Sequence, residues 1–439
     1  MSVSPEAKAS KRRRQPVARH GVLKSPNPFL QILTVLGAIV AVVAISIGAV
    51  GTFALWDAGR AVADNSVALE GSSDAQLPPS IGEIEGGVNM LVVGTDSCEG
   101  QDLALFPRCG IDDDGGERND VTMLVHISDA PRRVTVVSFP RDMLVPIPSC
   151  PDDNGGRYPA MSAQMMNASY MYGGLACTVL TVKQLTGIDI QFAASIRWTG
   201  VINMSDAIGG VDVCLADDIK DGNTGLDLKA GTHTLQGAEA LQFLRIRHGI
   251  GDGSDLGRIS NQQQFMSSMV RKLQSGGVLA DPQTLFNLAT TAVQQVTSKQ
   301  LVLSESLANP TRMVQIAMAI KDVAYEDIVF VQYPTVYDGG GVHVLPVTSA
   351  ADVLFDALAN NQPIRLTGDA SQGYGVQVEG TATKPGTEET AAPTPEATAD
   401  AGAPVATDSP VAPVDDTVDL PSSISGTTAA QVTCTVGER

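Results

Sequence analysis

The longest apolar stretch of the chain lies near its N-terminus. Residues 29–56 contain no charged side chain, and about 20 apolar residues suffice to cross a bilayer as a helix. A cleaved signal peptide is the alternative, but its apolar core is only about 7–15 residues long. Residues 1–28 carry seven Lys and Arg against a single acid, Glu6, and basic residues favour the cytoplasmic side. We therefore predict a cytoplasmic basic tail (1–28), a transmembrane helix (29–56) and an extracytoplasmic remainder.

Short apolar runs recur after residue 87 and end at glycine or polar turns, as strands do. The run 88–94 predicts a buried strand, and the runs 121–127 and 133–139 flank a polar turn and predict a β-hairpin. Helical patterns and further strands then alternate, which is typical of α/β layers. The helical patterns cover 161–174, 175–187, 199–210 and 235–244, and the later strands cover 190–198, 211–215 and 327–334.

These elements predict an α/β fold, namely a layered α-β-α domain with a mixed central sheet over residues 88–370. Residues 57–87 are poor in aromatic side chains and are predicted to form a stalk. From residue 371 the chain turns to Ala, Thr, Pro, Gly and acids, with Lys384 and Arg439 as its only basic residues. Such a composition buries too little apolar surface to order itself, so we predict a disordered tail over 371–439.

Charge narrows the classes of function. The formal net charge is −19, and binding to nucleic acid needs a basic face that displaces counterions. We therefore expect no nucleic-acid partner. Net charge is a sum, however, and it leaves room for one local basic pocket.

All six cysteines follow the predicted span, in a compartment where disulfides persist. None lies in a CxxC pair, and no spacing is typical of zinc. The pair Cys98–Cys109 closes a short loop and is the favoured disulfide, with Cys150–Cys177 second. Cys214 and Cys434 remain, and their pairing would fold the tail back onto the domain. Buried free thiols are the alternative.

Two aspartates lie at the ends of neighbouring predicted strands. Asp96 follows the run 88–94, and Asp120 precedes the run 121–127. Ligands collect at such strand ends in open α/β sheets, and Mg²⁺ prefers one or two carboxylates together with phosphate oxygens. The pair therefore indicates a magnesium site. The alternative is that both are turn residues, where Asp is common.

Arginines gather near the same strand ends. Arg118 precedes Asp120, and Arg141 with Asp142 follows the third strand directly. Guanidinium groups match phosphate oxygens with two parallel hydrogen bonds. A surface ion pair between Arg141 and Asp142 is the plainer interpretation.

The segment 245–264, "RIRHGIGDGSDLGRISNQQQ", concentrates this chemistry. Arg245 and Arg247 share a face only where the backbone is extended, so the preceding helix should end near residue 244. Asp255 is a plausible helix cap, which places Arg258 in the first turn of the next helix. Arginine there opposes the helix dipole unless an anion is present, and helix starts bind phosphate. The segment therefore predicts an anion cradle, with a salt-bridged structural loop as the alternative.

Seven motifs occur together and in order: "VVGTDS", "RNDVTMLV", "VSFPRDM", "NASYMYGG", "GGVDV", "LQGAEALQFLRIRH" and "DLGRISNQQQ". In this order and spacing the chain resembles the LytR-CpsA-Psr family over roughly residues 88–275. The resemblance implies a membrane-anchored phosphotransferase with an extracytoplasmic catalytic domain. Such enzymes move a glycopolymer from a polyprenyl-pyrophosphate carrier to peptidoglycan through a phosphodiester bond, with teichoic acids, capsules and arabinogalactan as substrates.

The resemblance also implies residue roles. Asp96 and Asp120 match the family's Mg²⁺-associated aspartates, and Asp255 matches the acid just before its last arginine. The arginines that match pyrophosphate contacts are Arg118, Arg141, Arg245, Arg247 and Arg258. The sequence departs from the family pattern at three positions, which are Cys98, Asn119 and Asn261.

Three functions remain open at this point. The chain transfers a glycopolymer, hydrolyses polyprenyl pyrophosphate, or only binds that lipid as a regulatory or scaffold protein. The resemblance also implies an apolar slot for the polyprenyl chain. Asp142 and Asp255 are candidates for the catalytic base, and Asp96 or Asp120 would serve if the metal does not engage it fully.

Overall fold

A computed structural model of the chain describes residues 57, 59–70, 87–111, 116–152, 154–275, 282–384 and 416–438, besides the isolated positions 29, 33 and 46. The predicted cytoplasmic tail and nearly all of the predicted span 29–56 lie outside these residues. Within the described part, no helix has both the length and the apolar character needed to cross a membrane. The folded unit considered below begins at residue 58.

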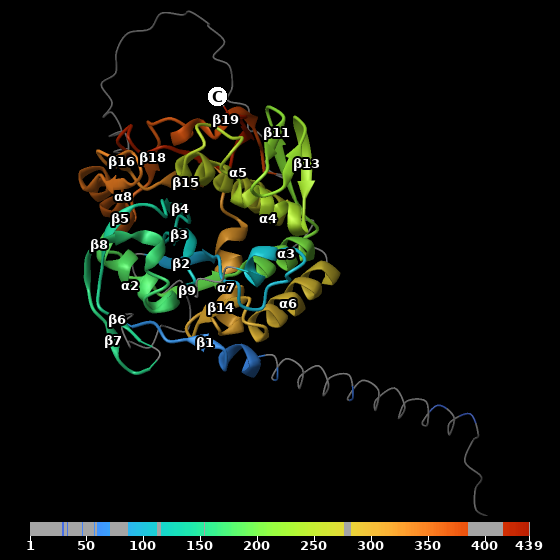
Figure 1. Cartoon of the computed structure of the whole chain (residues 1–439). Coiled ribbons are helices and arrows are strands. Elements are labelled where there is room, and N and C mark those ends of the chain that lie inside the picture. The colour runs from blue at the N-terminus through green and yellow to red at the C-terminus, as the bar shows by residue number, and fades with distance from the viewer. Residues whose placement is uncertain are drawn as a thin grey trace, which may run out of the picture. The chain divides into compact units, whose positions relative to one another are not determined.

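A mixed sheet forms the centre of this unit (Figure 1). In the described residues its order is β1-β14-β9-β2-β3-β4-β15-β21. The strands β2, β3 and β4 are antiparallel neighbours, whereas β9 and β15 run parallel to β2 and β4. The bounds are β1 Ser66–Val67, β2 Val88–Thr95, β3 Asn119–Ile127, β4 Val134–Phe139, β9 Phe192–Ile196, β14 Leu301–Ser304, β15 Ile328–Gln332 and β21 Gly426–Thr428.

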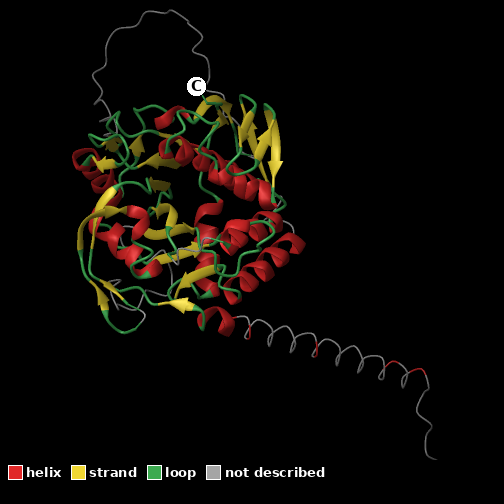
Figure 2. Cartoon of the chain, viewed as in Figure 1, coloured by secondary structure: helices red, strands yellow, loops and turns green. Residues whose placement is uncertain are grey.

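Helices cover both faces of this sheet (Figure 2). Side chains alternate along β2, so Leu91 and Val93 pack toward α2 and α8, while Val88 packs with α6 and α7. The predicted α-β-α layering with a mixed sheet is therefore confirmed. The helices are α2 Gly174–Thr186, α3 Trp198–Ala207, α4 Gly237–Arg245, α5 Asp255–Gln274, α6 Pro282–Thr297, α7 Pro310–Lys321 and α8 Thr348–Ala359.

A second sheet, ordered β13-β10-β22-β19 in the described residues, packs on α4 and α5. Its strands are β10 Val211–Leu215, β13 Gly231–Leu235, β19 Val376–Thr381 and β22 Gln431–Thr435. Small two-stranded pairs complete the fold: β5 Leu144–Ile147 with β8 Met161–Met165, β6 Cys150–Pro151 with β7 Arg157–Tyr158, β11 Ile219–Asp221 with β12 Leu226–Leu228, β16 Thr335–Tyr337 with β17 Val344–Pro346, and β18 Ile364–Arg365 with β20 Val418–Asp419.

The helix predicted over 161–174 is wrong. Residues 161–165 form β8, and only a short 3₁₀ turn, Met166–Ala168, follows. The Met166 and Asn167 amides donate to the carbonyl oxygens of Met143 and Arg141 at 2.8 and 3.0 Å. These non-local bonds outweigh the helix-favouring composition of the segment and fix the backbone that carries Arg141.

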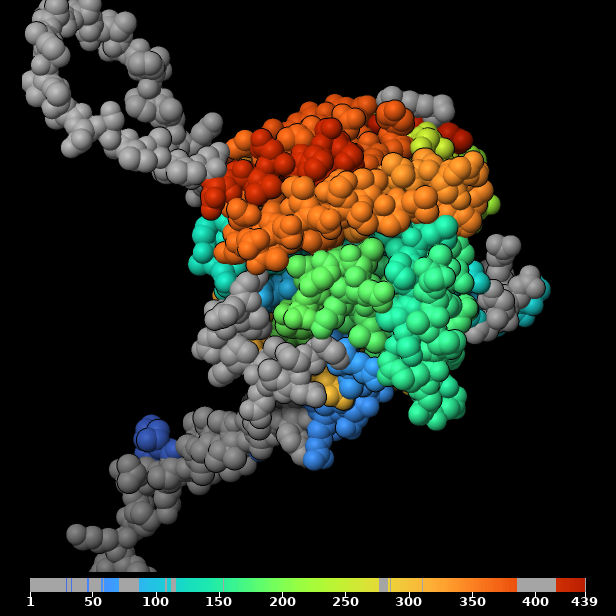
Figure 3. Space-filling view, turned by 90° about the vertical axis from the view of Figure 1, so that its left-hand side faces the viewer, coloured from blue at the N-terminus to red at the C-terminus, as the bar shows by residue number. Residues whose placement is uncertain are grey.

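The predicted tail also needs correction. Residues 371–384 and 416–438 are part of the fold, because β19 and β22 lie in the second sheet and β21 pairs with β15. Figure 3 shows the C-terminal residues packed among those that precede residue 385. Residues 385–415 lie outside the described residues. Composition over 371–439 was misleading because it averages the Ala-, Thr-, Pro- and acid-rich residues 385–415 with the strand-forming residues 416–438.

The predicted stalk is corrected in the same way at its start. Residues 59–63 are helical, and β1 pairs in parallel with β14, which makes it an edge strand of the main sheet. Residues 71–86 of the predicted stalk lie outside the described residues. The domain therefore uses chain on both sides of the predicted boundaries at 88 and 370.

The predicted disulfides all form. Cys98 pairs with Cys109, Cys150 with Cys177, and Cys214 with Cys434. The third joins the neighbouring strands β10 and β22, across a sequence separation of 220 residues. It fastens the C-terminal strand to the body of the domain.

Candidate functional site

Strand register brings the two predicted metal ligands together. Because β2 and β3 are antiparallel, with Thr95 opposite Asn119, Asp96 leaves the sheet where Asp120 enters it. The Arg118 amide donates to Asp96 Oδ1 at 2.7 Å, and the Asp96 amide donates back to the Arg118 carbonyl at 3.1 Å. Burial raises the pKa of Asp96, and the charge of Asp120 adds to that rise.

The turn after β4 places Arg141 against Asp120. Arg141 Nη1 lies 2.7 Å from Asp120 Oδ1, and its Nε lies 3.3 Å from Asp255 Oδ1 and 3.5 Å from Asp142 Oδ1. The ion pair between Arg141 and Asp142, which was the plainer interpretation of the sequence, is thus the longest of the three contacts. Arg141 instead forms the centre of a network that joins three carboxylates.

The N-terminus of α5 supplies the next arginine. Ser254 caps the helix by accepting from the Gly257 amide at 3.3 Å, so the predicted cap at Asp255 is wrong by one residue. Asp255 instead occupies the first helical position and pairs with Arg258 at 2.6 Å. Arg258 Nη2 also donates to the Asp120 carbonyl oxygen at 2.9 Å. The side chains of Arg258 and Asp255 are both buried, with 5% and 8% of their surface exposed.

The remaining arginines follow α4. The helix ends at Arg245, and Ile246 is extended, close to the end predicted from the sequence. The Arg245 guanidinium lies 4.1 Å from the centroid of the Trp198 ring. Arg247 has different neighbours, since it lines a cavity with Asp142. Burial raises the pKa of Asp142, and the charge of Arg247 offsets part of that rise. The structure therefore gives the two arginines separate surroundings.

The electrostatics of the cluster separate its carboxylates. Burial, reinforced by Asp120, raises the pKa of Asp96 to about 6. Burial also acts to raise the pKa of Asp120, but the charges of Arg258 and Arg141 outweigh it and lower that pKa. Burial and Asp255 raise the pKa of Asp142. Asp120 is thus held ionised, while Asp96 and Asp142 resist ionisation.

Several buried donors of the cluster lack a partner. The Nε atoms of Arg247 and Arg258 are buried without a hydrogen bond among the described residues. Buried polar atoms in folded proteins are normally satisfied, and guanidinium donors fit phosphate oxygens well. Burial and the neighbouring Arg258 lower the pKa of Arg245, against the opposing pull of Asp120. Both observations fit a site that accepts an anion.

Asp96 and Asp120 are the carboxylates of the cluster that could hold a divalent cation. Burial is the main reason why the pKa of Asp96 is raised, and repulsion by Asp120 adds to it; a cation between the two carboxylates would remove that repulsion. Within the described residues, no group of three or more His, Cys, Asp and Glu could hold a metal. A cation here would therefore take its other ligands from water and phosphate, as Mg²⁺ commonly does.

The three departures from the family pattern serve the fold. Asn119 Nδ2 donates to Thr122 Oγ1 at 2.7 Å. Asn261 Nδ2 donates to the Phe243 carbonyl at 2.7 Å, and its Oδ1 accepts from Thr435 at 2.6 Å. Cys98 closes the first disulfide. Asn261 therefore anchors the end of α4 and the C-terminal strand to α5, in place of a phosphate contact.

Sequence reasoning missed Trp198, the first residue of α3. Its ring lies 4.8 Å from that of Phe106, which belongs to the loop closed by Cys98–Cys109. The scarcity of Trp, with two in the chain, was the available signal. The disulfide loop thus supports Trp198, and Trp198 supports Arg245.

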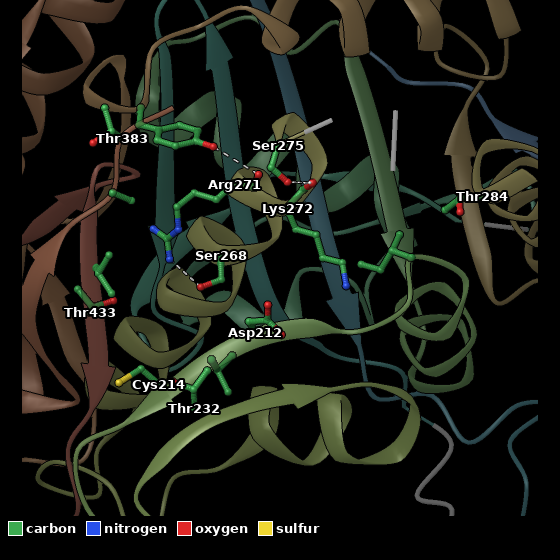
Figure 4. Close-up of a pocket in the computed structure, with 15 residues that line it drawn as sticks. Asp212, Cys214, Thr232, Ser268, Arg271, Lys272, Ser275, Thr284, Thr383 and Thr433 are labelled. Atoms are coloured by element: carbon green, nitrogen blue, oxygen red, sulfur yellow. Dashed lines mark hydrogen bonds between the residues drawn. The ribbon is translucent and has the colours of Figure 1, made fainter. Parts of the chain in front are cut away.

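Away from the arginine cluster, a hollow of about 690 Å³ lies between α5 and the second sheet (Figure 4). It contains two basic side chains, but the protein itself engages both. Arg271 Nη2 donates to Ser268 Oγ at 2.7 Å, and Lys272 Nζ donates to the Gly209 and Gly210 carbonyls at 2.8 and 2.6 Å. This hollow is therefore a poorer anion site than the arginine cluster.

The comparisons with known proteins show the family of the chain. A family model described as the LytR_cpsA_psr family matches residues 58–354. The chain belongs to the LytR-CpsA-Psr family. The match confirms the family that the sequence motifs indicated.

Two similar proteins come from Corynebacterium glutamicum. The probable cell wall biosynthesis protein LcpB is 34% identical over 211 residues, which cover 47% of each chain. The cell wall biosynthesis protein LcpA is 28% identical over 321 residues, covering 66% of this chain and 59% of that protein. The chain thus spans about half of the length of these curated relatives. A solved LytR-Csp2A-Psr enzyme from Actinomyces oris aligns at 21% identity and a TM-score of 0.47, covering 62% and 90% of the two chains.

Proposed function

We propose that the chain is an Mg²⁺-dependent phosphotransferase of cell wall biosynthesis. It moves a glycopolymer from a polyprenyl-pyrophosphate carrier to peptidoglycan and forms a phosphodiester bond. One observation carries the proposal: Arg141, Arg245 and Arg258 surround Asp120, and the Nε atoms of Arg247 and Arg258 are buried without a hydrogen-bond partner among the described residues. Family membership supports it, because relatives are named as cell wall biosynthesis proteins.

Each residue has a role in this proposal. Arg118, Arg141, Arg245, Arg247 and Arg258 hold the pyrophosphate oxygens. Asp96 and Asp120 would hold Mg²⁺, which when bound would supply positive charge to neutralise the phosphates. Asp255 keeps Arg141 and Arg258 in place through its ion pairs at 3.3 and 2.6 Å.

The transfer itself exchanges one bond to phosphorus for another. An acceptor hydroxyl oxygen attacks the phosphorus that bears the glycan, and the bridging oxygen leaves with the polyprenyl phosphate. Asp142 takes the hydroxyl proton, since burial and Asp255 raise its pKa and thereby make it a better proton acceptor. Asp255 is the poorer base because two arginines engage it. The arginines stabilise the charge on the leaving phosphate.

The proposed location follows from the N-terminal sequence. The basic residues 1–28 lie in the cytoplasm, residues 29–56 span the cell membrane, and the folded domain lies outside it. The carrier lipid is then delivered in the membrane to which the domain is attached, so an acidic domain needs only a local basic pocket. Protease added to intact spheroplasts should degrade the domain and spare the N-terminus. Protection of the domain would contradict this orientation.

The decisive experiment incubates the full chain in detergent with a labelled synthetic polyprenyl-pyrophosphate sugar and Mg²⁺. The proposal predicts a labelled phosphodiester product only when peptidoglycan fragments are present. Release of sugar phosphate at an equal rate with and without fragments would favour a phosphohydrolase. Tight lipid binding without turnover would favour a regulatory or scaffold protein. Omission of Mg²⁺ and the variant Asp120→Asn are the controls for the metal.

A further inference from the structure

A smaller cavity adjoins the arginine cluster beneath the hairpin β16–β17. It measures about 180 Å³, and its lining includes Asp142, Arg247, Asp255, Tyr337, Val342 and Val344. We call it the hairpin cavity. A cavity of roughly 150 Å³ accommodates a benzene ring, so this one has room for a single six-membered ring.

The hairpin is firmly joined to the catalytic turn. The Val344 amide donates to the Asp142 carbonyl at 3.4 Å, and Met143 and Val344 form a β-bridge. At the tip, the Asp338 amide donates to the His343 carbonyl at 2.9 Å, which closes the turn. The position of Tyr337 is therefore coupled to the turn that carries Arg141 and Asp142.

Two features of the cavity lining do not contribute to the stability of the fold. Tyr337 and Val342 are 50% and 70% exposed, although both are large and apolar. Arg247, which also lines the cavity, has a buried Nε atom without a hydrogen-bond partner among the described residues. An aromatic ring, an aliphatic side chain, a carboxylate and a guanidinium thus line one small space.

Sugar rings match this combination of groups. The C–H face of a pyranose packs on the negative face of an aromatic ring, and its hydroxyls need both donors and acceptors. Asp142 offers an acceptor and Arg247 offers donors, whereas a purely apolar ligand would leave both unsatisfied. The mixed lining therefore favours a glycan over a lipid chain.

We propose that the hairpin cavity binds one pyranose ring of the acceptor glycan, with Tyr337 as its stacking platform. This assignment rests on the proposed phosphotransfer function. The acceptor is favoured over the sugar of the donor because Asp142, the proposed base, lines the cavity and must reach the attacking hydroxyl. Asp142 lies 3.5 Å from Arg141, so the bound ring adjoins the phosphates.

The test measures binding to the full chain in detergent without turnover. The probes are a soluble peptidoglycan disaccharide, farnesyl pyrophosphate, and farnesyl-pyrophosphoryl-N-acetylglucosamine. We expect Tyr337→Ala to weaken disaccharide binding about tenfold or more, whereas Tyr337→Phe retains it because the ring remains. Val336→Ala is the matched control, since Val336 is its exposed neighbour in β16 and does not line the cavity. It should bind the disaccharide as the wild type does.

Several outcomes would overturn the assignment. Equal disaccharide binding by the wild type and Tyr337→Ala would exclude the platform. A loss that affects only the sugar-bearing donor, relative to farnesyl pyrophosphate, would assign the cavity to the donor sugar. A loss confined to binding of phosphatidylglycerol vesicles would assign the hairpin to the membrane surface. Failure of all three variants to retain the wild-type melting temperature would give the hairpin a structural role. Failure of the wild type to bind farnesyl pyrophosphate would instead count against the proposed function.

Discussion

The guanidinium of Arg245 lies 4.1 Å above the ring of Trp198, which itself packs 4.8 Å from Phe106 in the loop closed by Cys98–Cys109. This contact holds the Arg245 guanidinium, for which no ion pair is found among the described residues. An arginine that faces a pyrophosphate loses less entropy on binding when its plane is fixed beforehand. The disulfide loop is thereby connected to the candidate site.

Removal of the stacking ring should weaken the function of Arg245. A cation–π contact is worth about 0.5–2 kcal/mol, so we expect Trp198→Leu to lower kcat/KM for the pyrophosphate donor roughly 2–30-fold. Trp198→Phe keeps an aromatic face and should recover most of the rate. Steady-state turnover and melting temperature should be measured together. A Leu variant that keeps the wild-type rate would show that Trp198 only fills space.

Magnesium binding should depend on pH through Asp96. Burial and Asp120 raise its pKa to about 6 from 3.8, so the protonated form is favoured in the fold. Its contribution to stability is complete below the unfolded value and is lost as pH rises through about 6. Because Mg²⁺ competes with that proton, Mg²⁺ should raise the melting temperature more at pH 7.5 than at pH 5, both values spanning that titration. Asp96→Asn should abolish the difference, and an equal shift at both pH values in the wild type would contradict the site.

Arg247→Lys separates charge from geometry. Lysine keeps the charge but lacks the planar fork and the Nε donor that is buried and unpartnered here. Loss of one donor that stabilises a transition state costs about 10²–10³ in rate. We expect kcat to fall by about two orders of magnitude at an unchanged melting temperature. Early melting with normal turnover would support a structural salt-bridge role instead.

The C-terminal strand should be essential for stability. Cys214–Cys434 closes a separation of 220 residues, and the chain-entropy model assigns such a loop roughly 5 kcal/mol. Gln264 of α5 also donates to the Cys214 and Thr433 carbonyls at 2.7 and 2.9 Å. Cys434→Ser should therefore lower the melting temperature strongly. A truncated chain that ends at residue 415 should fail to fold. A truncated chain with wild-type stability would contradict the integration of β22.

The features that depend on local sequence pattern could be predicted from the sequence. Alternating apolar runs identified β2, β3 and β4, and antiparallel register then brings Asp96, Asp120 and Arg141 together. Order and spacing of the cysteines also indicated the three pairs. These features depend on neighbours in sequence or in one sheet, so they can be predicted before a structure is known.

The rest depends on distant partners. The strand at 431–435 pairs with β10 and β19. Cys434 indicated a link to Cys214, but the segment itself does not show that it forms a strand between these two partners. Ser254 and Asp255 are both good caps, and only the backbone decides between them. Trp198 reaches Arg245 because α3 packs on α4. Sequence pattern alone could not reveal contacts that tertiary packing creates.

A crystal structure with farnesyl pyrophosphate and Mg²⁺ bound would test the central claim most directly. We predict that the two phosphates lie among Arg141, Arg245 and Arg258, next to the Nε donor of Arg258, which is buried without a hydrogen-bond partner among the described residues. The metal should lie between Asp96 and Asp120 and share phosphate oxygens. Phosphates bound in the hollow beside Arg271 and Lys272, with an empty arginine cluster, would contradict the account.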